Sequence, residues 1–225
     1  MPENSGRIIR RAEIALMSLV LAIAVIGLTL LPLTTPGFVH ALVTLVDAEE
    51  LTGLGRAETI QAAEAVRRFV LDPDAPDLPT QINGQPAFDE ASSSHLIDVR
   101  NVIVPARYAA LLSPVVVLLW AVARRRKPEV VVPALSGAAW VLVASTGAAA
   151  LVGLADFDSF FTWFHGLFFA PGTWQFPADA LLIQVFPLAF WMTSAAAWAA
   201  LIVMSAALLF IFAHWLRFTR RADGV

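Results

Sequence analysis

The sequence predicts an all-α membrane protein with four transmembrane helices, a mixed extracytoplasmic cap between spans 1 and 2, and an aromatic re-entrant or interfacial loop between spans 3 and 4. Of the 225 residues, 58% are hydrophobic and only 15% are charged, and the mean hydropathy is +0.72. These values are typical of polytopic membrane proteins rather than of soluble domains. Clusters of arginine and lysine also precede or follow the apolar stretches, and in a four-span topology all of these clusters lie on the same side of the membrane. We therefore treat residues 1–225 as a single integral membrane domain.

The first span is expected at about residues 14–33, a stretch without charge. At about 1.5 Å per residue it reaches roughly 30 Å, the thickness of a hydrocarbon core. Arg7, Arg10 and Arg11 precede it, so the positive-inside rule places the N-terminus in the cytoplasm. The alternative is a cleaved signal peptide, since residues 39–41 would suit a peptidase. The apolar stretch is longer than the core of a signal peptide, which favours a span.

Residues 36–101 form the predicted cap, which holds eleven of the eighteen acidic residues and many prolines and glycines. Within it, residues 57–71 have a helical pattern that ends at Asp72-Pro73. Residues 38–46 are apolar, and their periodicity does not distinguish a strand from a helix. The 57–71 helix is expected to bury one apolar face against the bundle or the interface, and this face carries Ile60, Val66 and Val70.

The remaining spans are expected at about residues 103–123, 130–154 and 188–216. Basic residues at 124–127 and after 216 place the second turn and the C-terminus in the cytoplasm. Pro187 divides the last apolar run and leaves residues 155–187 as the aromatic loop. The third span is rich in small residues that let helices approach closely; these are Gly137, Ala138, Ala139, Ser145, Gly147 and Ala148.

Composition excludes several function classes. The chain has no cysteine, and it lacks a glycine-rich phosphate loop, a zinc-protease motif and a serine-hydrolase elbow. The cap and the aromatic loop together carry fourteen acids against four arginines, and Arg107 follows shortly after the cap. This acidic outer face would attract a cationic group and not a nucleic acid.

His95 is the first candidate for acid-base chemistry. If the chain is helical here, Asp98 lies at i+3 on the same face, where its carboxylate could fix the imidazole tautomer. Arg100 is close enough to serve as an oxyanion or carbonyl partner. The alternative is a helix start at which one of the serines 92–94 is the N-cap and Asp98 is solvated. Spacing alone does not separate these two interpretations.

His165 is the second candidate. It lies in the aromatic segment between Asp156 and Trp191, and Asp158 precedes it by seven residues. Ionisable residues at a span boundary indicate a functional site, although a lone histidine among aromatics is often only a packed residue. His95 and His165 lie outside adjacent span boundaries on the same side. Two imidazoles there, with acids to orient them, suit general acid-base transfer on a lipid-linked substrate at the outer leaflet.

Three sequence motifs carry a family resemblance: HLIDVR from His95, DFDSFFTWFHGLFFAPGTWQF, and DALLIQVFP. In order and spacing they resemble the small four-span bacterial membrane proteins that include the lipoprotein intramolecular transacylase. Members with known activity move an acyl chain from the sn-2 position of the diacylglyceryl group on a lipoprotein's N-terminal cysteine to the α-amine of that cysteine. The product is a lyso-lipoprotein. The resemblance implies that His95 and His165 are the catalytic histidines.

The leading hypothesis is therefore an acyltransferase of the bacterial cytoplasmic membrane, with both termini cytoplasmic and the active site on the outer face. Its partners would be diacylated lipoproteins and membrane lipid. It would need no metal and no soluble cofactor, because ester and amine are on one substrate molecule. One histidine would deprotonate the amine and the other would protonate the glycerol oxygen. The expected supporting or orienting residues, some of them facing the oxyanion, are Asp98, Arg100, Asp158 and Trp174.

The alternative hypothesis is a non-enzymatic accessory protein that binds lipid or lipoprotein. Its aromatic residues would anchor it at the interface, and His95 and His165 would not need to converge. The two hypotheses therefore differ in whether His95 and His165 must lie close together. The sequence does not indicate an oligomeric state.

Overall fold

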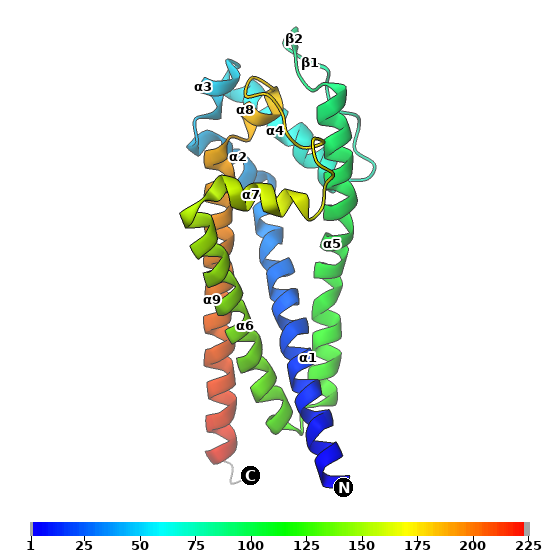
Figure 1. The fold of residues 1–225 in the computed structure, drawn as a ribbon, viewed down its shortest axis with the longest axis vertical. Coiled ribbons are helices and arrows are strands. Elements are labelled where there is room, and N and C mark those ends of the chain that lie inside the picture. Colours follow the sequence, from blue (N-terminus) through cyan, green and yellow to red (C-terminus); the bar gives the residue numbers. More distant parts are fainter. Residues whose placement is uncertain (1, 223–225) are drawn as a thin grey trace. The chain divides into compact units, whose positions relative to one another are not determined.

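The computed structural model describes residues 2–222, and side chains from residue 4 to residue 219. The described chain is almost entirely helical (Figure 1), which confirms the predicted all-α class. Four helices are long and apolar enough to cross a membrane. The elements in order are α1 (Pro2–Leu30), η1 (Leu31–Thr34), α2 (Pro36–Leu45), α3 (Ala48–Thr52), α4 (Arg56–Leu71), β1 (Gln81–Ile82), β2 (Gln85–Pro86), α5 (Glu90–Ala123), α6 (Pro128–Ala155), α7 (Phe157–Gly166), α8 (Leu181–Val185) and α9 (Leu188–Ala222).

The chain divides into two compact units. The first unit comprises the described parts of residues 1–29, 109–151 and 198–225, and the second unit comprises residues 30–108 and 152–197. The first unit is built only from segments of α1, α5, α6 and α9. The second unit holds the cap, the aromatic loop and the adjoining turns of the long helices.

Small residues of α6 pack closely in the first unit. The Ser18 hydroxyl donates to the carbonyl of Ala134 at 3.2 Å, and a Cβ on Gly137 would lie 2.3 Å from that hydroxyl oxygen. Ala138 and Ala139 are fully buried. The prediction of close approach is thus confirmed for this half of α6 and wrong for the other half, because Ser145, Gly147 and Ala148 are exposed.

In the second unit, α2 and α4 pack against each other and share one apolar core with α8 and the start of α5. The ambiguous segment 38–46 is helical, because Thr35 accepts a hydrogen bond from the Phe38 amide and Pro36 occupies the first helical turn. The helix predicted over residues 57–71 is confirmed as α4. Its buried face is turned slightly from the predicted one: Val66 is 6% exposed, whereas Ile60 and Val70 are half-buried and the inner positions are Thr59, Ala62, Ala63 and Phe69.

A two-residue hairpin interrupts the cap. β1 and β2 pair antiparallel, with Ile82 opposite Gln85. Asn83 and Gly84 between them both have positive φ, 51° and 77°, as an Asn-Gly turn of type I′ requires. The hairpin places the buried side chain of Ile82 in the core of the second unit.

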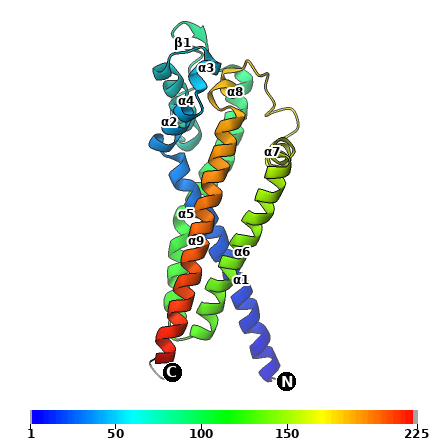
Figure 2. The same ribbon diagram turned by 90° about the vertical axis from the view of Figure 1, so that its left-hand side faces the viewer.

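The aromatic loop contains two short helices. Asp156 caps α7 by accepting a hydrogen bond from the Ser159 amide at 3.0 Å. Figures 1 and 2 show α7 from the side and end-on, so it runs crosswise to the α5 and α9 segments of the same unit. Pro187 lies between α8 and α9, as predicted from the sequence.

Candidate active site

His95 lies in the second turn of α5 and points into the interior of the second unit. Its side chain is 8% exposed, and its ring contacts Phe169 at 5.1 Å and Phe176 at 5.6 Å between centroids. The buried Nδ1 has no hydrogen-bond partner among the described residues.

The N-cap of α5 is Asp89, whose carboxylate accepts from the Ser92 amide at 2.8 Å. The serine cap of the alternative interpretation is therefore wrong, because Asp89 caps the helix.

Asp98 lies one turn beyond His95, as its spacing predicts. Within the described chain, however, no hydrogen bond joins the two side chains, and Asp98 is half-buried. The His95 ring instead packs between phenylalanines. Helical spacing brings two residues to one face, but rotamers decide whether they touch.

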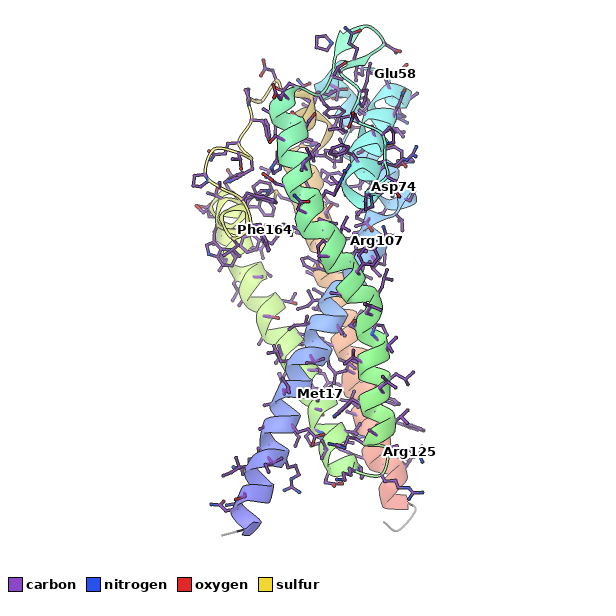
Figure 3. All side chains as sticks on the ribbon, turned by 90° about the vertical axis from the view of Figure 1, so that its right-hand side faces the viewer. Met17, Glu58, Asp74, Arg107, Arg125 and Phe164 are labelled. Atoms are coloured by element: carbon purple, nitrogen blue, oxygen red, sulfur yellow. The ribbon has the colours of Figure 1, made fainter. Side chains whose placement is uncertain are left out.

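Arg100 ties α5 to the end of α4. Its Nε donates to the Phe69 carbonyl at 2.5 Å, and its guanidinium lies 3.9 Å above the Phe69 ring. Seven residues further along α5, Arg107 donates to the Leu71 carbonyl at 3.3 Å (Figure 3). The last carbonyls of a helix have no partner within it, so these arginines cap α4. One Arg100 nitrogen, Nη2, is buried and keeps no partner in the described structure.

His165 lies in the last turn of α7, and a backbone carbonyl orients it. Its Nδ1 lies 2.9 Å from the Phe161 carbonyl oxygen. A carbonyl can only accept, so the proton is on Nδ1 and the lone pair is on Nε2. Burial lowers the pKa of His165 below its ordinary value, and the bond to Phe161 opposes this only in part. His165 is therefore neutral near pH 7, with a free basic nitrogen.

The two histidines share an aromatic neighbour. The Phe169 ring contacts His95 at 5.1 Å and His165 at 5.8 Å between centroids. One imidazole comes from α5 and the other from α7, and all these residues belong to the second unit. Phe169 thus brings together two side chains that are seventy residues apart in the sequence.

Trp174 contacts one of the two histidines. Its indole lies against His165 at 4.7 Å with an interplanar angle of 31°. The indole Nε1 is buried and has no partner among the described residues, like His95 Nδ1 and Arg100 Nη2. Leaving such a buried group unpaired costs about 1–3 kcal/mol. Two more such atoms, Glu49 Oε2 and Ser194 Oγ, occur among the described residues of this unit. Those of His95 and Trp174, whose rings belong to the aromatic cluster, indicate groups kept free for a ligand.

Other candidate residues lie away from this cluster. Asp158 is exposed and makes no hydrogen bond to a histidine in the described chain. His40 is on α2, where its Nε2 contacts Glu64 at 3.1 Å, and His214 is exposed on α9. Over residues 2–222, no group of three or more His, Asp or Glu side chains is arranged to hold a metal. Phe176 and the Phe161 carbonyl were not foreseen, because aromatic density does not reveal which ring or carbonyl contacts a histidine.

Four apolar helices long enough to cross a bilayer define the class of protein, a multi-pass integral membrane protein. A sequence model of the lipoprotein intramolecular transacylases (Lit) matches residues 14–191. The chain belongs to this family, and the protein is accordingly an acyltransferase. A comparison with curated protein sequences found no match.

Solved structures of the Bacillus cereus lipoprotein intramolecular transacylase have the same fold. One is 17% identical, covers 95% of this chain and 98% of its own, and has a TM-score of 0.83. A structure with a histidine-to-arginine mutation is 15% identical, with coverages of 99% and 98% and a TM-score of 0.76. A structure with a histidine-to-alanine mutation is 16% identical, with coverages of 99% and 100% and the same TM-score. These similarities confirm the fold of a membrane-integral protein.

Proposed function

We propose that this protein transfers the sn-2 acyl chain of a diacylglyceryl-cysteine to the α-amine of the same cysteine, giving a lyso-lipoprotein. The observation that carries the proposal is the convergence of His95 and His165 on the Phe169 ring. An accessory lipid-binding protein would not need two imidazoles at one place. Acid-base catalysis by two positioned groups needs this arrangement.

His165 is the general base of the proposed reaction. Its Nδ1 proton is held by the Phe161 carbonyl, so Nε2 is free to accept a proton from the amine. The lowered pKa of His165 keeps this nitrogen unprotonated at neutral pH. As the amine loses its proton, its nitrogen attacks the ester carbonyl and the new C–N bond forms.

His95 is the general acid. The C–O bond to the glycerol sn-2 oxygen breaks, and that oxygen takes a proton from His95. Both imidazoles are neutral at the start, so as one His95 nitrogen gives its proton to that oxygen, the other His95 nitrogen receives the proton that His165 accepted, and both rings end neutral. The unpaired Nδ1 of His95 supports this role, since no protein group competes for it.

The oxyanion of the tetrahedral intermediate needs a donor beside the base. Trp174 Nε1 fits best, because the indole lies against His165 and its N–H is buried and free. Arg100 Nη2 is a second free donor, but the guanidinium is already fixed to Phe69. Asp98 and Asp158 have no contact that supports more than an indirect role.

We place the site at the outer face of the bacterial cytoplasmic membrane, with both termini in the cytoplasm. The distribution of basic residues supports this orientation: bases occur in the first turns of α1, in the turn after α5 and in the last turns of α9, whereas acids dominate residues 36–101.

Mass spectrometry of a reporter lipoprotein tests the function. We expect cells with the wild-type protein to convert the reporter's N-terminus to the N-acyl lyso form. A positioned acid or base contributes about 10²–10⁴-fold in rate, so His95→Ala and His165→Ala should abolish conversion at equal expression. His214→Ala, an exposed histidine of the first unit, is the matched control and should convert normally. Normal conversion by His165→Ala would refute the assignment.

A further inference from the structure

The second unit contains a cavity of about 370 Å³ that does not include either site histidine. Such a volume is within the usual range of ligand pockets. The end of α3, the hairpin, the start of α5 and the segment leading into α8 form its walls. Its polar lining residues are Thr52, Gln85, Asp89, Ser92, Asp179 and Gln184.

Two of the lining residues are close in sequence to His95 or to a ring that contacts His95. Ser92 lines the cavity and precedes His95 by three residues on α5, so both lie on one helix face. Their separation along the axis is about 4.5 Å. Asp179 also lines the cavity and follows Phe176 by three residues, and the Phe176 ring contacts His95 at 5.6 Å. The cavity therefore begins about one helical turn from a histidine of the proposed site.

Half of the twelve lining residues are polar, and two of these are acidic. The lining includes the carboxylates of Asp89 and Asp179 and no lysine or arginine. Hydrogen bonds from Ser92 hold the pKa of the Asp89 carboxyl below its usual range, so this group remains charged. The amides of Gln85 and Gln184 can both donate and accept, as a peptide backbone requires. This chemistry suits an extended peptide better than an acyl chain.

We propose that this cavity is the subsite for the polypeptide segment that follows the lipidated cysteine, and that it favours cationic over anionic side chains there. The inference rests on the proposed function. In the substrate, the cysteine's carbonyl is bonded to the same carbon atom as its α-amine. When the substrate's amine lies at the histidines, its polypeptide chain must therefore start within a few ångströms of them. The cavity is close to His95 and has polar side chains that can bind a peptide backbone.

A competition between two lipopeptides tests the subsite. Both carry the diacylglyceryl-cysteine, and they differ only in having lysine or glutamate at the next two positions. Mass spectrometry of one mixed reaction gives the ratio of their conversion rates, which does not depend on the amount of folded protein. Exposed charge pairs change an equilibrium by up to about fivefold, so two positions should give the lysine peptide an advantage of about tenfold with wild-type protein.

Asp179→Lys reverses one charge of the cavity at an exposed position. We expect it to reduce the lysine preference by about fivefold to tenfold. Asp77→Lys is the matched control, an exposed acid of the same unit that does not line the cavity, and it should keep the wild-type ratio. Equal ratios in all three proteins would overturn the subsite while leaving the transacylation intact.

Binding to the His165→Ala variant separates the two proposals. If wild-type protein converts neither lipopeptide, the proposed function fails, and fluorescence anisotropy of the labelled lipopeptides then decides the subsite alone. Tighter binding of the lysine peptide that Asp179→Lys removes would support the subsite. Equal binding of both peptides would overturn it.

Discussion

Removal of a single N–H group from Trp174 should slow the reaction and leave the fold intact. Trp174→Phe keeps an aromatic ring against His165 and deletes Nε1, which is buried and has no partner in the described structure. Loss of one oxyanion donor typically lowers kcat by about 10²–10³-fold, which corresponds to about 2.7–4 kcal/mol of transition-state stabilisation. Stability should change little, because the smaller ring loses contacts while an unpaired buried donor is removed.

The assay is the initial rate of lyso-lipopeptide formation by purified protein, together with the thermal unfolding midpoint of each variant. Trp163→Phe provides the control. Trp163 is in the same loop but is 60% exposed and contacts only Phe160 among the aromatic rings described. If Trp174→Phe and Trp163→Phe had equal rates, the indole N–H would not stabilise the oxyanion and Trp174 would be a packing residue.

Three further predictions concern pH, packing and orientation. Because His165 must be neutral to accept a proton and burial lowers its pKa, the rate should fall only as the pH drops below about 6.5; a flat acid limb in the pH-rate profile would contradict this. Gly137→Ala should destabilise the protein by roughly 1–3 kcal/mol because its Cβ meets the Ser18 hydroxyl, and Ser18→Ala should recover part of the loss in thermal unfolding. In this cysteine-free chain, a membrane-impermeant maleimide should label Thr80→Cys in intact cells and Thr219→Cys only after lysis; the reverse pattern would invert the topology.

Much of the fold could be predicted from the sequence, because hydropathy and charge asymmetry are signals that many residues contribute to. Four spans and the helix at residues 57–71 follow from such signals. The segment 38–46 was ambiguous by periodicity, yet Thr35-Pro36 before it is a readable helix start. In the third span, small residues marked close packing only where a partner helix is present, and the sequence does not locate the partner.

The site was predictable only in its principal residues. His95 and His165 could be placed together from topology and from the family motifs, but their contacts could not. Asp98 has the right spacing to orient His95, whereas the imidazole turns towards two phenylalanines. His165 is oriented by the backbone of Phe161, and every residue has a carbonyl, so composition contains no signal for it.

The ring of Phe169 has a further consequence for the resting protein. A phenyl group has no exchangeable proton, and no hydrogen bond joins the two imidazoles in the described chain. The route from one histidine to the other is therefore incomplete until a molecule with both an amine and an ester occupies the site. A phospholipid whose headgroup has no amine offers an ester but no removable amine proton. Such a lipid would leave the route open at one end, so the site can remain inactive towards lipids of this kind in the bilayer around it.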